Sequence, residues 1–218
     1  MFKKLNDEKD KELSLKYHDN FNIVMLLLII VFILIYLLQT TELSKFGIVR
    51  ADSGEENELT FTYIILFSFY FIVDIIWVVI EPNSVKASPL SIIIHHIIAL
   101  FILPFFVIST FRSYLVVGSL SEINTLFLIL RRNTVKGSFS YNLCHYLFLI
   151  TWFIFRIIMF PAITYFLFLE YTNYSSEINY FCNIRILPPL LTGALTLMSF
   201  YWTYDMIAKL NKEKKVNN

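Results

Sequence analysis

Six apolar runs, each about as long as a lipid bilayer is thick, constrain the fold of this sequence more than any other feature. A helix that crosses a bilayer needs roughly 20 predominantly apolar residues. Hydrophobic residues make up 57% of the 218-residue chain and charged residues 16%, which is more apolar surface than a soluble domain of this length can bury. We therefore predict an all-α, polytopic membrane protein. Its six expected transmembrane helices cover approximately residues 21–38, 61–80, 89–108, 114–130, 143–169 and 186–206.

The two ends of the chain are charged and differ from the apolar runs. The first run follows a long charged leader, and no small-residue cleavage site comes after it. We interpret it as a retained anchor rather than a cleaved signal peptide. Residues 1–20 are expected to form a solvated cytosolic leader, and residues 21–60 the first helix with a luminal loop. The core domain would cover residues 61–209, and residues 210–218 would form a basic cytosolic tail.

The distribution of lysine and arginine predicts the orientation in the membrane. With the N-terminus in the cytosol, thirteen of the 18 basic residues lie in cytosolic segments and four on the opposite side. This bias follows the positive-inside rule, so both termini should be cytosolic. Cys144 and Cys182 then lie on opposite sides of the membrane, which excludes a disulfide bond between them. The glycosylation sequon at Asn173 falls in a luminal loop.

Several ionisable side chains interrupt the apolar runs, although each costs roughly 2.5–3.5 kcal/mol within a span. The helical rise places Asp74, the adjacent pair His95 and His96, and Glu122 all roughly 9–12 Å inside the cytosolic boundary. Prolines toward the luminal ends of three spans should bend those helices. The pattern predicts a polar cavity open to the cytosol with an apolar luminal part, which suits an amphipathic ligand. The prolines are Pro104, Pro161, Pro188 and Pro189.

Each of these polar residues also has a structural interpretation. Asp74 could serve only to bond a neighbouring helix, and Arg156 to neutralise Glu122. Adjacent histidines point about 100° apart on a helix. One of the pair is therefore expected to face the ligand, while the other bonds a neighbouring helix. Tyr201 and Trp202, near the cytosolic end of the last span, are equally typical of an interfacial aromatic belt.

The histidine pattern gives little support to a metal centre. The chain contains four histidines, and neither the HxxxH nor the HxxHH pattern of membrane di-iron enzymes occurs. A single zinc ion held by His95 or His96 with Asp74 and Glu122 remains an alternative with few ligands to support it. We predict no metal and no resident cofactor.

Five short motifs, in order along the predicted spans, resemble those of the TLC (TRAM–LAG1–CLN8) domain family. The resemblance covers roughly residues 61–209 and is strongest to the small TLC domain-containing proteins. The motifs are YFIVDIIWV around Asp74, HHIIALF at the histidine pair, EINTLFLILR from Glu122, TWFIFRIIMFP around Arg156, and FYWTYDMI with Tyr201 and Trp202.

The sequence departs from the ceramide synthases, which are the enzymatic branch of the family. In those enzymes two aspartates spaced three apart follow the histidine pair. The corresponding positions here are Glu122 and Thr125, so the second acid is missing. The small TLC proteins usually have serine where this chain has Asn124. These departures count against ceramide synthase activity and not against membership of the wider family.

The resemblance implies six spans around a central cavity that accepts a long acyl chain. The leading interpretation is a membrane protein of the endoplasmic reticulum that binds acyl lipids, contributes to membrane lipid homeostasis and has no nucleic-acid partner. One alternative is an acyltransferase with acyl-CoA as substrate, in which histidine acts as general base or acyl carrier. Another is a small proton-coupled transporter, although no inverted repeat supports it. The catalytic candidates are His95, His96, Asp74 and Glu122, and the lipid-binding candidates are Arg156, Asn124, Tyr201 and Trp202.

Overall fold

The computed structural model describes residues 2–39, 55–86, 88–180 and 182–217. The described residues are helical without any strand, and six helical segments are long and apolar enough to cross a membrane. The all-α prediction and the six spans are therefore confirmed. The first two spans are the uninterrupted helices α1 (Phe2–Gln39) and α3 (Glu55–Ile80), and the short helix η1 (Pro82–Ser84) leads to the third span.

The other four spans are each built from more than one helical segment. The third is α4 (Pro89–Ile102) followed by the 3₁₀ helix η2 (Leu103–Val107). The fourth is α5 (Ser109–Ser119) and α6 (Glu122–Arg132). The fifth consists of α7 (Phe139–Thr151), the π-helix η3 (Trp152–Met159) and α8 (Phe160–Glu177). The sixth consists of η4 (Ile184–Ile186) and α9 (Leu187–Asn217).

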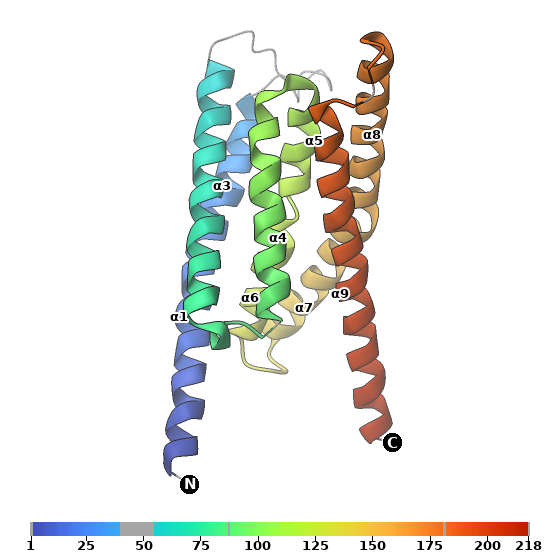
Figure 1. The fold of residues 1–218 in the computed structure, drawn as a ribbon. Helices are drawn as coiled ribbons and strands as arrows, with labels where there is room; N and C mark the ends of the chain where they lie inside the picture. The colour runs from blue at the N-terminus through green and yellow to red at the C-terminus, as the bar shows by residue number, and fades with distance from the viewer. Residues whose placement is uncertain (1, 40–54, 87, 181, 218) are drawn as a thin grey trace.

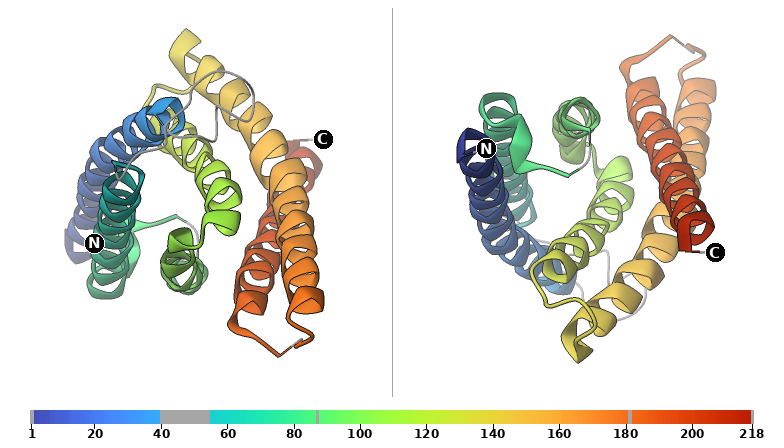
Figure 2. Two further views of the ribbon diagram at one scale, coloured as in Figure 1. Left: turned by 90° about the horizontal axis from the view of Figure 1, so that it is seen from above. Right: turned by 90° about the horizontal axis from the view of Figure 1, so that it is seen from below.

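The helices form a bundle in which neighbours follow one another around a centre. Helix α1 packs against α3 and α6, α3 against α4, α4 against α9, α9 against α8, and α8 against α5 (Figure 2). Both ends of the chain lie at the same end of the bundle, which we call the terminal end (Figure 1). An even number of spans places both termini at the same end of the bundle. This agrees with the prediction that the two termini lie on a common side of the membrane.

The outer surface of the bundle is apolar, which is the reverse of a soluble protein. Leu27 and Val31 on α1 and Ile72, Ile76 and Val79 on α3 are all exposed. Continuous exposed apolar surface of this kind marks contact with a membrane or a partner. The interior holds stacked aromatic rings, so the bundle does not depend on the bilayer alone for its packing.

Prolines coincide with the changes of helix type. Pro104 lies in η2, and Pro161 lies in the first turn of α8, which follows the π-helix. Proline lacks an N–H group and leaves the carbonyl four residues earlier without its helical partner. The changes of helix type in the third and fifth spans thus have local causes in the sequence, and the predicted bends stay a prediction.

Two expectations from the sequence need correction. The leader is not solvated throughout, because α1 continues through it and His18 and Asp19 are only 3% and 2% exposed, although Lys11 and Lys16 before them are exposed. The sequon at Asn173 does not lie in a loop, because α8 extends to Glu177. The fifth apolar run ends before α8 does, and the polar residues in the last turns of α8 led us to predict the end of the helix too early. Cys144 and Cys182 are both free.

Candidate functional site: a buried polar cluster beside a central cavity

Asp74 lies at the centre of a buried polar cluster that joins three helices. Its Oδ1 atom accepts a hydrogen bond of 2.7 Å from His18 Nε2 on α1, and its Oδ2 atom lies 3.1 Å from His96 Nδ1 on α4. Asn22, one turn after His18, places its amide nitrogen 3.3 Å from His18 Nδ1. Because a buried carboxylate is costly unless it is paired, these contacts hold α1, α3 and α4 in one arrangement.

The second histidine of the pair faces a different environment. His95 lines a cavity together with Glu122, and its ring lies edge-on to Trp202 of α9 with the ring centres 5.4 Å apart. Among the described residues its Nδ1 atom has no hydrogen-bond partner. The two adjacent histidines thus have separate roles: His96 contacts the carboxylate of Asp74, and His95 contacts the cavity.

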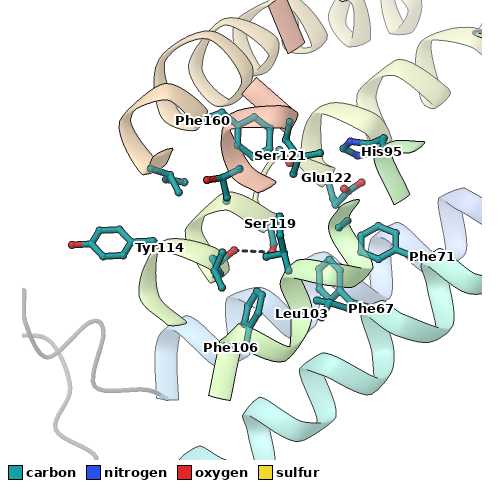
Figure 3. A pocket seen from close by; sticks show the side chains of 17 residues that line it. Phe67, Phe71, His95, Leu103, Phe106, Tyr114, Ser119, Ser121, Glu122 and Phe160 are labelled. Carbon is teal, nitrogen blue, oxygen red and sulfur yellow. Dashed lines mark hydrogen bonds between the residues drawn. The ribbon is translucent and has the colours of Figure 1, made fainter. Parts of the chain in front are cut away.

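The cavity occupies the centre of the bundle. It is lined by residues of every span except the first. Most of the lining is apolar, with phenylalanine side chains such as Phe67, Phe106 and Phe160, whereas His95 and Glu122 lie together away from Phe106 and Tyr114 (Figure 3). The space within it is about 60 Å³, a few times the 10–15 Å³ that one water requires. The cavity is therefore small, and His95 and Glu122 mark one end of it, which we call the polar end.

A break in the fourth span brings Glu122 to the cavity. Helix α5 ends at Ser119, and α6 begins at Glu122. A broken helix at membrane depth is tolerated where it borders protein or a cavity. Glu122 is 6% exposed and lies in the first turn of α6, where the helix dipole favours a negative charge. Ser119, Ser121 and Glu122, which are polar residues within an apolar run, lie at this break.

Arg156 lies in the π-helix of the fifth span and is 3% exposed. The sequence suggested that it pairs with Glu122. The two side chains interact electrostatically, but no ion pair within 4.0 Å joins them among the described residues. Arg156 instead lies against the rings of Trp152, Phe160 and Trp202, at 5.9, 5.2 and 5.9 Å from their centres.

The remaining candidates do not line this cavity. Asn124 is 1% exposed, and its amide group donates to the carbonyl oxygen of Phe148 and to the Thr151 hydroxyl at 2.9 and 3.1 Å. These bonds tie α6 to the fifth span. Tyr201 is 64% exposed on the outside of α9, the position of a residue that faces lipid. Trp202 is half-buried and contacts both His95 and Arg156.

Sequence reasoning missed His18, because it lies before the first apolar run and was assigned to the solvated leader. A usable signal was present. His18, Asp19 and Asn22 are polar at spacings of one and four along the helix that enters the membrane, and all three are buried. Asp19 pairs with Arg132 and accepts a hydrogen bond of 3.0 Å from Asn133. Among the residues described, no three His, Cys, Asp or Glu side chains are placed to hold one metal ion.

These features define a helical membrane protein with a small central cavity and a buried histidine–carboxylate cluster beside it. The model of the TLC domain family matches residues 20–208. The chain therefore belongs to the TLC domain family. The match begins before the five motifs, so it includes nearly all of the first span. In two further comparisons, no curated protein and no solved structure matches the chain.

Proposed function

We propose that the protein binds a long acyl chain in its central cavity and thereby contributes to membrane lipid homeostasis. The observation that carries the proposal is the form of the cavity. It is small and mostly apolar, and it has His95 and Glu122 together at one end. Ligand sites typically combine an apolar lining with a few placed polar groups. An unbranched chain fits such a space better than a bulky ring system, and a polar group of the ligand would meet His95.

The arrangement of the histidines favours binding over acyl transfer. A histidine that acts as base or acyl carrier is usually oriented by a carboxylate on its other ring nitrogen. Here the carboxylate of Asp74 lies beside His96, whereas His95 lines the cavity. The ring that contacts the carboxylate and the ring that lines the cavity thus belong to two different histidines. Acyltransferase activity is the second candidate, because the two rings are adjacent with their centres 5.4 Å apart.

Gly118 offers a direct test of chain binding. It lines the cavity, and a Cβ atom at this position would lie 3.5 Å from Ile163 Cδ1 and 3.9 Å from Phe160 Cε1. Alanine therefore fits, whereas leucine would occupy part of the cavity. We expect Gly118→Leu to weaken binding of radiolabelled palmitate to the purified protein at least about tenfold, and Gly118→Ala to leave binding nearly unchanged. Equal binding by both variants would place the ligand elsewhere.

The catalytic alternative has its own test. Lipids of cells that contain the wild-type protein, His95→Ala or His96→Ala would be compared by mass spectrometry. Loss of one acylated product with either variant, together with retained palmitate binding, would indicate acyl transfer. Unchanged products with both variants would restrict the site to binding.

A further inference from the structure

Arg156 is a buried arginine with hydrogen-bond donors that no described residue fills. Its guanidinium carries five N–H donors and no acceptor. The side chain is 3% exposed, and among the described residues neither Nε nor Nη1 has a hydrogen-bond partner. Buried polar groups without partners are rare in folded proteins. Arg156 therefore has donor capacity that the described side chains do not fill.

The neighbours of Arg156 satisfy its charge only in part. The rings of Trp152, Phe160 and Trp202 surround the guanidinium at 5.2 to 5.9 Å, a distance at which ring faces attract a cation. Rings do not supply the oxygen acceptors that the planar N–H fork matches. Arg112 makes an instructive comparison within the same bundle. It is also buried, but its Nε atom donates to the Phe106 carbonyl at 2.9 Å.

Arg156 lies next to the polar end of the cavity. Phe160 separates the two, since this ring lines the cavity and also contacts the guanidinium. Trp202 contacts both Arg156 and the cavity-lining His95. Glu122, which also lines the cavity, acts electrostatically on Arg156 without filling its donors. A small anionic group that enters beside Glu122 and displaces the Phe160 ring would reach the unused N–H groups.

We propose that Arg156 is the anchor for an anionic head group, so that the ligand of the cavity is an acyl chain ending in a carboxylate or a phosphate. This inference rests on the proposed function and specifies its ligand class. Arginine is suited to the task, because its planar fork binds both kinds of group with two parallel hydrogen bonds. The apolar lining accommodates the chain, and Arg156 selects the charged end.

The test uses the full chain in nanodiscs of phosphatidylcholine and needs no variant for its first arm. Palmitate, hexadecyl phosphate, hexadecanol and methyl palmitate compete against radiolabelled palmitate. We expect at least one of the two anions to bind about tenfold or more tightly than both neutral chains, since a hydrogen bond to a charged group is worth about that factor. The anion that binds more tightly identifies the head group. Equal affinities of all four would overturn the anchor while leaving chain binding intact, whereas no binding of any would refute the proposed function itself.

Variants test whether Arg156 is responsible for the preference for anionic over neutral chains. Arg156→Met should reduce the affinity for the anion to that of the neutral chains, and Arg156→Lys should restore part of it. Arg112→Met is the matched control, since it also removes a buried arginine. It should leave the ratio of anion to neutral affinity unchanged. A ratio that is unchanged in Arg156→Met, or reduced equally in Arg112→Met, would overturn the proposal.

Glu122 provides an opposite prediction. Its negative charge competes with the ligand for Arg156. Glu122→Gln should therefore increase the affinity for the anion and leave the affinity for the neutral chains unchanged. Weaker binding of the anion by this variant would place the ligand's charge away from Arg156 and contradict the inference.

Discussion

At the scale of single residues, the pairing of His18 with Asp74 is the contact that most changes the interpretation of the sequence. A side chain of the presumed leader supplies the hydrogen bond of 2.7 Å to the buried carboxylate. The sequence indicated that Asp74, His95, His96 and Glu122 lie at a common depth, since that follows from helical rise alone. It could not indicate which histidine faces which partner, because this depends on the rotation of each helix about its axis.

Removal of His18 should destabilise the protein. In His18→Ala the Oδ1 atom of Asp74 loses its hydrogen bond inside the bundle, and an unsatisfied buried group costs about 1–3 kcal/mol. We expect a lower melting temperature for the purified protein in detergent. Lys16→Ala, an exposed change on the same helix, serves as the control. Equal melting temperatures for the two variants would show that the contact contributes nothing to stability.

At the scale of elements, the interrupted spans determine what reaches the cavity. Ser119, Ser121 and Glu122 are polar residues of the fourth span, and the helix is interrupted there. The prolines of the third and fifth spans lie at changes of helix type. The π-helix before Pro161 was not predicted, because an extra residue per turn leaves no distinct pattern in a uniformly apolar run. Arg156 lies in this π-helix and contacts the rings of Phe160 and Trp202.

Asn124 should hold α6 to the fifth span. Asn124→Leu removes the hydrogen bonds to the Phe148 carbonyl and the Thr151 hydroxyl, and we expect a loss of about 1–2 kcal/mol in stability. Palmitate affinity per folded molecule should stay unchanged, since Asn124 does not line the described cavity. Thermal unfolding and the palmitate competition assay measure the two quantities. Weaker palmitate binding at full stability would instead support the lipid-binding role first assigned to this residue.

At the scale of the whole molecule, hydropathy was sufficient to predict the number and order of the spans, because each apolar run must satisfy its backbone within a helix. Hydropathy could not predict the order of the helices around the centre or the small volume of the cavity. These depend on the packing of aromatic side chains: the ring centre of Tyr63 lies 4.4 Å from that of Phe67 and 4.6 Å from that of Phe106. Periodicity specifies a helix face and not the volume that remains between faces.

The orientation in the membrane is a further prediction about the whole molecule. A reporter placed after Asn218 should be cytosolic, and one inserted beside Ser176, near the end of α8, should be luminal. The reason is the excess of basic residues in the segments on the terminal side. Protease protection of each reporter in intact microsomes makes the measurement. Protection of both reporters, or of neither, would contradict the orientation.

The most direct measurement of the central claim is the position at which an acyl chain contacts the protein. Palmitate with a photoreactive diazirine in mid-chain would be cross-linked to the purified protein, and the modified residues identified by mass spectrometry. We predict adducts on cavity-lining residues of α5 and α8, such as Leu115 and Ile163, that excess palmitate abolishes. Adducts confined to outward-facing residues such as Phe153 and Leu197, and unaffected by excess palmitate, would contradict binding of the chain in the central cavity.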